Sequence, residues 1–182
     1  MRIIAGRLKN REIYSPKSNL VRPVSARARK AIFDILNPEI KGAVVLDLYC
    51  GSGIFGIEAI SRGGAFAHFV DLNVKLVLKN IEKYNLSDVA AVHRKDVGRY
   101  IRSAAAKNMH FDIIFVDPPW PEIEQAAQVF SLLDNPDILQ PGGRMMLKIP
   151  EKFDAAQSFH NISIYKEKIV GNAKLVFLRC SE

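Results

Sequence analysis

The pattern of apolar and polar positions divides most of the chain into short apolar runs that alternate with segments of helical spacing. The runs are rich in β-branched and aromatic residues, which predicts strands at about 44–48, 65–70, 89–94, 111–116 and 143–149. Between them, apolar residues recur at helical intervals, which predicts helices at about 54–62, 73–85, 97–107 and 121–133. This alternation predicts an α/β fold, in which helices cover both faces of a mostly parallel sheet.

The N-terminal part of the chain departs from this alternation. Arg2 to Ser15 has the pattern of a β-hairpin that turns near Lys9-Asn10. The segment from Ser25 to Leu36 predicts a helix that ends before Pro38, because the residue before a proline disfavours helical geometry.

The last part of the chain predicts an antiparallel end to the sheet. Ile162 to Lys168 and Lys174 to Arg179 have the pattern of two strands around a Gly-Asn turn. So short a connection joins antiparallel strands, whereas parallel strands need a longer crossover. With the strands above, the sequence predicts a seven-stranded sheet with an antiparallel C-terminal finish.

A glycine-rich loop follows the first predicted strand, with the sequence Asp47-Leu48-Tyr49-Cys50-Gly51-Ser52-Gly53. Glycine lets a ligand approach the backbone closely, and the helix after the loop begins with free N–H groups that suit a carboxylate or a phosphate. The glycines at 51, 53 and 56, with Asp71 twenty residues after the first, match the fingerprint of dinucleotide-binding proteins. A nicotinamide oxidoreductase is therefore one interpretation of the loop.

Four predicted strands end at an aspartate, namely Asp47, Asp71, Asp96 and Asp117. The carboxyl ends of parallel strands meet at one edge of a sheet, where α/β proteins bind ligands. A carboxylate at Asp47 opposes a pyrophosphate but suits an amine. S-adenosylmethionine offers an ammonium group, ribose hydroxyls and an adenine amino group, and we expect Asp47, Asp71 and Asp96 to bind them in that order. The alternative for each aspartate alone is a surface or helix-capping role.

The sequence Asp117-Pro118-Pro119-Trp120 follows the apolar run 111–116. The prolines stop the strand and leave the carboxylate and the aromatic ring at its carboxyl end. These groups are suited to hold an exocyclic amine of a nucleobase, with Asp117 and the Pro118 carbonyl as hydrogen-bond acceptors. Trp120 is expected to stack on the base. A simple strand-ending turn is the structural alternative.

Positive charge is concentrated at the N-terminus. The chain has a net charge of +7, whereas residues 1–30 hold nine Arg and Lys against one acid, Glu12, for a net charge of +8. Such a local cluster is typical of a polyanion site, although a solvated face or a membrane-surface arm is the alternative. We expect residues 1–40 to form an RNA-binding appendage of a catalytic domain, residues 41–182. The expected RNA contacts are Arg2, Arg7, Arg22, Arg27 and Arg29.

Four stretches together resemble a known family, namely Met1 to Arg7, Arg22 to Leu36, Asp47 to Gly63 and Phe111 to Pro119. Their order and spacing are similar to those of class I S-adenosylmethionine-dependent methyltransferases, and more narrowly of the RsmD-type family of bacterial 16S ribosomal RNA guanine-N2 methyltransferases. The resemblance implies a Rossmann-like fold and methyl transfer to the exocyclic N2 of a guanine. The chain departs from the usual family pattern at Ala26, Lys30, Asp71, Trp120 and the turn at 170–173.

The resemblance also implies site residues and partners. It places methyl transfer at Asp117, Pro118, Pro119 and Trp120. It places S-adenosylmethionine at Asp47, Tyr49, Cys50, Gly51, Ser52, Gly53, Asp71, Leu72, Asp96 and Val97. The expected partner is ribosomal RNA or a small-subunit assembly particle, bound by a monomer. The alternatives are N6-adenine methylation of RNA or DNA, where Asp-Pro-Pro-Trp is also used, and a non-catalytic RNA-binding module.

Other features of the sequence narrow the class of protein. No apolar run reaches the roughly 18 residues needed to cross a membrane, and the N-terminus lacks the apolar centre of a signal peptide. Cys50 and Cys180 do not suggest a disulfide framework, so a cytoplasmic location is expected. The histidines lack metal-ligand spacing, and no metal is expected.

Overall fold

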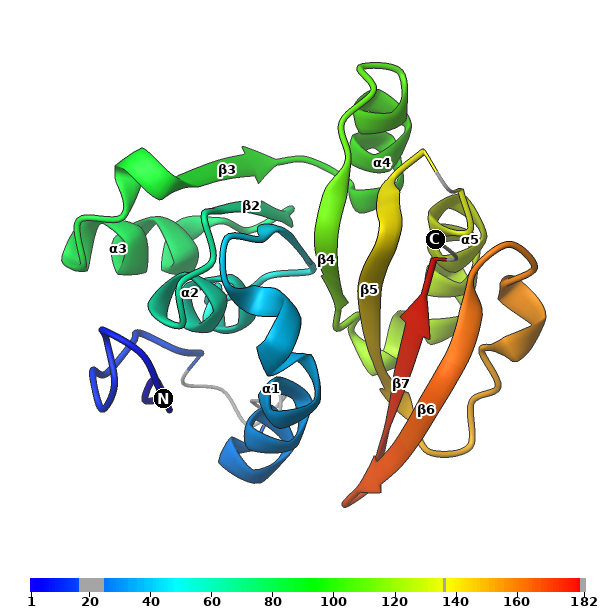
Figure 1. The fold of residues 1–182 in the computed structure, drawn as a ribbon, viewed down its shortest axis with the longest axis horizontal. Helices are drawn as coiled ribbons and strands as arrows, with labels where there is room; N and C mark the ends of the chain where they lie inside the picture. The colour runs from blue at the N-terminus through cyan, green and yellow to red at the C-terminus, as the bar shows by residue number, and fades with distance from the viewer. Residues whose placement is uncertain (17–24, 136, 181–182) are drawn as a thin grey trace.

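The computed structural model describes residues 1–16, 25–135 and 137–180, which form a mixed sheet of seven strands (Figure 1). The strands are β1 (Val44–Leu48), β2 (Phe66–Asp71), β3 (Ala90–Arg94), β4 (Phe111–Val116), β5 (Leu139–Pro150), β6 (Ser163–Val170) and β7 (Ala173–Arg179). Their order in the sheet is β3-β2-β1-β4-β5-β7-β6. β1 to β5 are parallel, whereas β7 is antiparallel to both β5 and β6. The predicted sheet, with its antiparallel finish, is confirmed.

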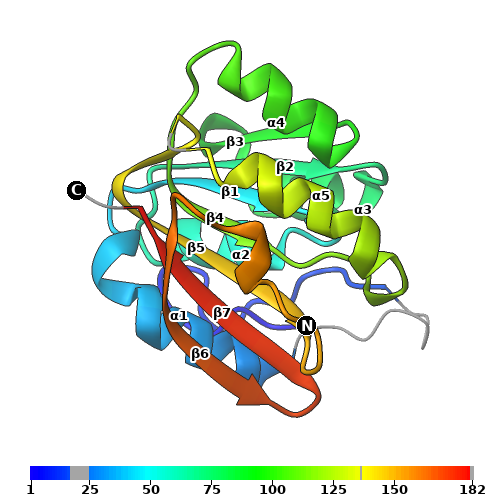
Figure 2. The same ribbon diagram turned by 90° about the vertical axis from the view of Figure 1, so that its right-hand side faces the viewer.

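Helices cover both faces of this sheet (Figures 1 and 2). They are α1 (Ala26–Ile40), α2 (Ile54–Ser61), α3 (Lys75–Lys83), α4 (Val97–Ala105) and α5 (Ile123–Leu133), with short 3-10 helices η1 (Ser87–Val89), η2 (Trp120–Glu122) and η3 (Ala156–Ser158). One core cluster packs α1, α2 and α3 around Phe33, Phe69 and Phe115. The other packs α4 and α5 around Phe111 and Phe130. Within the described ranges, no helix is long and apolar enough to cross a membrane.

Helix α1 is longer than the sequence predicts. It begins after Ser25, whose Oγ accepts a hydrogen bond from the N–H of Ala28 at 3.1 Å, and it continues through Pro38 to Ile40. The expected end before Pro38 is therefore wrong. Leu36 and Ile40 are buried in the core, and their burial favours a further turn more strongly than the exposed proline disfavours it.

The N-terminal segment forms a loop docked on α2 rather than the predicted two-stranded hairpin. Its two arms are joined by an antiparallel bridge between Arg2 and Glu12, with backbone hydrogen bonds from Ile3 to Arg11 at 2.9 Å and from Ile13 to Met1 at 2.8 Å, but the described residues form no strand there. The backbone N–H groups of residues 4 and 5 instead donate to Glu58 on α2, at 2.8 and 3.0 Å. The buried side chains of this loop belong to the core cluster of α1, α2 and α3; they are Ile3, Leu8 and Ile13. The described residues among the first forty, 1–16 and 25–40, therefore share their core with the rest of the protein.

Candidate active site

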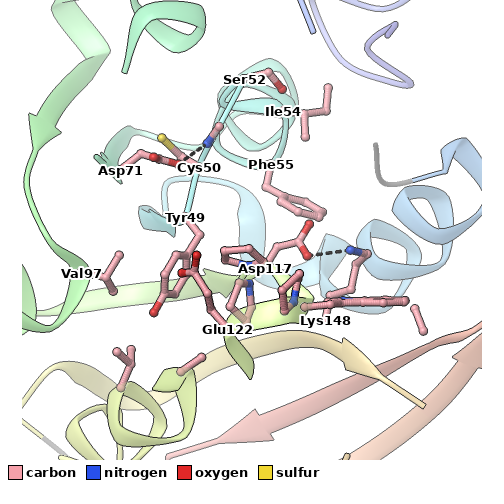
Figure 3. Close-up of a pocket in the computed structure, with 18 of the residues that line it drawn as sticks. Tyr49, Cys50, Ser52, Ile54, Phe55, Asp71, Val97, Asp117, Glu122 and Lys148 are labelled. Atoms are coloured by element: carbon pink, nitrogen blue, oxygen red, sulfur yellow. Dashed lines mark hydrogen bonds and ion pairs between the residues drawn. The ribbon is translucent and has the colours of Figure 1, made fainter. Parts of the chain in front are cut away.

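A cavity of about 1300 Å³ opens at the carboxyl ends of the parallel strands (Figure 3). It lies beside β1 and β4, the two central strands. From β1 the chain continues to β2 and β3 on one side of the sheet, and from β4 it continues to β5 on the other. This reversal of strand order is where open α/β sheets bind ligands. Most of the predicted cofactor and catalytic residues line it, namely Tyr49, Cys50, Gly51, Ser52, Asp71, Leu72, Asp96, Val97, Asp117, Pro118, Pro119 and Trp120. Asp47 and Gly53 are not among the lining residues.

The glycine loop owes its shape to left-handed backbone conformations. The φ angle is +56° at Tyr49, +52° at Gly51 and +76° at Gly53, the residue that precedes α2. Glycine adopts such angles without the steric cost that a side chain adds. Gly56 is required for a different reason, since a Cβ at this position would lie 2.3 Å from the ring of Phe69. Turn geometry and helix–sheet packing together explain the glycine pattern.

Asp47 is fully buried at the end of β1 and supports this loop. Its Oδ2 accepts a hydrogen bond at 2.9 Å from the N–H of Gly56, in the first turn of α2. Its Oδ1 has no hydrogen-bond partner among the described residues. Burial raises the pKa of Asp47 well above its usual range; the Gly56 N–H opposes this rise, and the charges of Asp117 and Asp71 add to it. The unpaired oxygen and the concentration of carboxylates favour a ligand with a cationic group.

Asp71 and Asp96, which also line the cavity, are held by backbone N–H groups. Asp71, the last residue of β2, accepts hydrogen bonds from the N–H groups of Gly51 and Asn73, both at 2.9 Å. Asp96 caps α4, with its Oδ1 accepting from the N–H of Arg99 at 2.9 Å. Each carboxylate oxygen has two lone pairs, so both side chains can still accept hydrogen bonds from a ligand.

On the side of the cavity formed by β4 and β5, Asp117 pairs with Lys148 (Figure 3). Lys148 Nζ lies 2.6 Å from Asp117 Oδ1, and the two side chains are 12% and 21% exposed. Burial raises the pKa of Asp117, and the charge and hydrogen bond of Lys148 oppose the rise. The centroid of the Trp120 ring lies 5.4 Å from the same Nζ atom. A carboxylate, an ammonium group and an indole ring therefore meet on one wall of the cavity.

Comparisons with known proteins agree with this geometry. Residues 1–179 match a family model described as "Conserved hypothetical protein 95". The chain is 31% identical over 182 residues to ribosomal RNA small subunit methyltransferase D of Buchnera aphidicola, an alignment that covers 98% of this chain and 93% of that protein. The chain belongs to the RsmD-type methyltransferase family. It is also 29% identical over 174 residues to the putative rRNA methyltransferase YlbH of Bacillus subtilis, covering 94% of each chain.

The solved structures of this family agree with the fold. The putative methyltransferase yhhF from Escherichia coli matches with a TM-score of 0.85 and 25% identity, covering 100% of this chain and 98% of that chain. Membership of the family confirms the predicted class I methyltransferase fold and S-adenosylmethionine as the cofactor. The nicotinamide oxidoreductase suggested by the glycine pattern is therefore excluded.

The arginines expected to contact RNA lie in different places relative to the cavity. Arg27, exposed in the first turn of α1, is among the lining residues. Arg2 and Arg7 are exposed on the docked N-terminal loop and are not. The backbone N–H of Arg7 donates to the carbonyl of Ser61, at the end of α2 that is remote from the glycine loop. Arg22 lies outside the described residues.

Arg29 is buried, so the prediction that it contacts RNA is wrong. Its side chain is 4% exposed, lies 3.7 Å from the carboxylate of Glu58, and donates to the backbone carbonyl of Arg2 at 2.9 Å. Burial lowers the pKa of Arg29, the charge of Glu58 opposes this, and that of Arg62 adds to it. The helical period turns Arg29 inward toward α2, so it anchors the N-terminal loop and is not accessible to a phosphate.

Sequence reasoning missed Lys148. Lys148 lies near the end of β5, beside Asp117, which follows β4. The two residues are neighbours because of the register between β4 and β5, and sequence periodicity does not determine that register. One signal was available, because Lys148 is the single charged residue in the run Met145-Met146-Leu147-Lys148-Ile149. A lysine in an otherwise buried strand requires a partner, and the nearest strand ends at Asp117.

Proposed function

We propose that this protein methylates the exocyclic N2 of a guanine in the 16S ribosomal RNA of the small subunit. The observation that supports this best is the segment from Asp117 to Trp120, which lines the same cavity as the glycine loop. The names of the relatives support ribosomal RNA as the substrate. The proteins from Buchnera aphidicola and Escherichia coli are named as small-subunit ribosomal RNA methyltransferases.

Two aspartates that line the cavity are the proposed contacts for polar groups of S-adenosylmethionine: Asp71 for the ribose hydroxyls and Asp96 for the adenine amino group. Asp47 is buried behind the lining residues, and we propose that the ammonium group lies nearest to it. The loop from Tyr49 to Gly53, which leads into α2, suits the carboxylate. Two cavity residues next to these aspartates offer the adenine ring apolar side chains, namely Leu72 and Val97. When bound, the cofactor supplies a methyl group on a positively charged sulfur.

Asp117 and the Pro118 carbonyl orient the acceptor amine in this proposal. The lone pair of an exocyclic amine is delocalised into the base, and acceptors for its N–H bonds favour the geometry in which that pair points at the methyl carbon. With the cofactor bound, the nitrogen would form its bond to the methyl carbon as the carbon–sulfur bond breaks, the neutral thioether would be the leaving group, and the proton of the methylated amine would pass to solvent. Stacking on Trp120 adds about 1–3 kcal/mol per base. Positioning of this kind supplies roughly 7–11 kcal/mol of barrier reduction in the best cases.

Arg27 is the proposed contact for a phosphate next to the target nucleotide, because it is exposed and lines the cavity that contains Asp117. A guanine must be unpaired or flipped to bring its amine into such a cavity. We propose that residues 1–40 supply further RNA contacts, with residues 41–182 as the catalytic part. The protein would act as a monomer in the cytoplasm, on ribosomal RNA or on an assembling small subunit.

Guanine methylation has two alternatives, a different acceptor base and a non-catalytic function. N6-adenine methylation of RNA or DNA would use the same carboxylate and prolines, because both reactions orient an exocyclic amine. A non-catalytic RNA-binding module would not require Asp117. The carboxylate of Asp117 nevertheless lines the cavity beside Lys148, where a substrate amine could reach it. We therefore favour the enzyme over the binding module. The names of the relatives favour ribosomal RNA over DNA, and the choice of guanine over adenine rests on the resemblance to the guanine-N2 methyltransferase family.

The proposal is tested with purified protein, S-adenosylmethionine, and either small-subunit ribosomal RNA or small-subunit particles from a strain that lacks the protein. Mass spectrometry of the nucleosides is expected to find N2-methylguanosine, and Asp117→Ala is expected to remove it. N6-methyladenosine in its place would support the adenine alternative. If the cofactor binds but no nucleic acid is methylated, the non-catalytic module is the better description.

A further inference from the structure

The ion pair between Lys148 and Asp117 occupies a particular place in the site. β4 and β5 are parallel neighbours in which Val116 is opposite Leu147. The residues that come next in the chain, Asp117 after β4 and Lys148 within β5, therefore lie side by side. Both side chains line the cavity, and both are mostly buried, at 12% exposure for Lys148 and 21% for Asp117. Among the ion pairs of the described residues, this is the one whose two members both line the cavity.

The pair leaves one carboxylate oxygen available. Lys148 Nζ donates to Asp117 Oδ1 at 2.6 Å, and no described residue donates to Oδ2. The ammonium group also lies 5.4 Å from the centroid of the Trp120 ring, a contact that holds the lysine chain beside the proposed stacking surface. The lysine therefore fixes the orientation of the carboxylate while leaving an acceptor atom for an incoming N–H group.

We propose that Lys148 is a positioning residue that keeps Asp117 ionised and oriented, so that the carboxylate accepts a hydrogen bond from the substrate amine at neutral pH. This inference rests on the role of Asp117 in the proposed function. A protonated carboxyl group carries its own O–H donor and no longer offers two acceptor oxygens to an N–H bond. Loss of ionisation would therefore weaken the interaction that orients the amine, because a neutral carboxyl oxygen is a weaker acceptor than a charged one.

The electrostatic surroundings of Asp117 explain why a partner is needed. Burial raises the pKa of Asp117, and Lys148 opposes this both by its charge and by its hydrogen bond. The charge of Asp117 in turn raises the pKa of Asp47 on β1. Arg27 on α1 and Glu122 on η2 line the same cavity and carry opposite charges. Lys148 is thus the cation in direct contact with the carboxylate.

The first test is the dependence of kcat on pH at saturating cofactor and RNA, for Lys148→Met, Lys148→Arg and the wild type. The rate falls as pH drops through the pKa of Asp117, and removal of the lysine charge raises that pKa. The acid limb of Lys148→Met is therefore expected to move to higher pH by about 1–3 units, with activity recovering in alkali. Lys148→Arg keeps the charge and should keep the acid limb near its wild-type position.

A control separates this effect from a general loss of charge. Lys152→Met removes an exposed lysine two residues after the end of β5 and is expected to leave the pH profile unchanged. If Lys148→Met lowers kcat equally at every pH, the lysine does not control the ionisation of Asp117 and the inference is wrong.

A second measurement needs no RNA. NMR of isotope-labelled aspartate carboxyl groups, with the Asp117 signal assigned from Asp117→Asn, gives its titration midpoint directly. The midpoint is expected to be higher in Lys148→Met than in the wild type, and equal midpoints would overturn the inference. If the midpoint shifts but the wild type methylates no ribosomal RNA, the pairing stands and the proposed function fails instead.

Discussion

The two sides of the cavity hold their carboxylates by different means. On the side proposed for the cofactor, Asp71 accepts hydrogen bonds from the backbone N–H groups of Gly51 and Asn73, and Asp47, buried behind the cavity wall, accepts one from that of Gly56. On the β4–β5 side, the described donor to Asp117 is the side chain of Lys148. Backbone donors follow from the course of the chain and do not titrate, whereas a side-chain donor changes with one substitution. The carboxylate orientation on the proposed cofactor side therefore depends on local chain geometry. On the β4–β5 side, called the acceptor side because Asp117 is proposed to bind the acceptor amine, it depends on the pairing of two opposite charges.

The largest effect is expected from Asp117→Ala. Because Asp117 is proposed to contact the acceptor amine, turnover at saturating RNA should fall at least about 10²-fold, the usual scale for one well-placed polar group in catalysis. Binding of S-adenosylmethionine, measured by calorimetry, should stay within a few-fold of the wild type. The two sides of the cavity would then be separable.

Asp112→Asn is a matched control for this substitution. Asp112 lies on the same strand near its other end, where its carboxylate accepts from the N–H of Val44 at 2.7 Å. Turnover in this control should remain near that of the wild type. Near-normal turnover of Asp117→Ala itself would show that the carboxylate has no part in the reaction.

A smaller effect, on the opposite step, is expected from Asp71→Ala. The substitution removes an acceptor for the proposed ribose hydroxyls and for the N–H of Gly51. A hydrogen bond to a charged group contributes about 1.5–3 kcal/mol, so the Kd for S-adenosylmethionine should rise by roughly 10- to 100-fold. At saturating cofactor, kcat should change much less than in Asp117→Ala.

Asp88→Ala is the control for the cofactor side, because Asp88 is an exposed acid in η1 and does not line the cavity. Its Kd is expected to equal that of the wild type. An unchanged Kd in Asp71→Ala would remove this residue from the proposed cofactor site and would weaken the contrast between the two sides.

The same contrast explains what the sequence could predict. Strand periodicity and glycine spacing identified β1, the loop and α2, because these depend on residues that are close in the chain. Asp71 and Asp96 could also be predicted from the sequence, since each lies at the carboxyl end of a predicted strand. Family membership confirms the cofactor, while the roles of the individual residues remain proposals.

Features that depend on tertiary contacts could not be predicted from the sequence. The partner of Asp117 follows from the register between β4 and β5. The inward position of Arg29 follows from the packing of α1 in the core, which places its guanidinium beside Glu58 on α2. The extension of α1 through Pro38 follows from the burial of Ile40. In each case, a neighbour that is remote in the chain decides between two locally acceptable outcomes.

The smallest effect is expected on the acceptor side, in the salt dependence of RNA binding by Arg27→Gln. If Arg27 neutralises one phosphate, its loss should lower the slope of log affinity against log salt by about 0.7–0.9, the counterion-release value per contact, with cofactor affinity unchanged. Lys41→Gln is the control, because this exposed lysine follows α1 and precedes the amino end of β1, opposite the cavity; its slope should stay the same. Arg29→Gln should also keep the slope but unfold at a lower temperature, since the substitution breaks a buried ion pair with Glu58. A reduced slope in Arg29→Gln with an unchanged Tm would mean that Arg29 turns outward to bind RNA, contrary to its buried position.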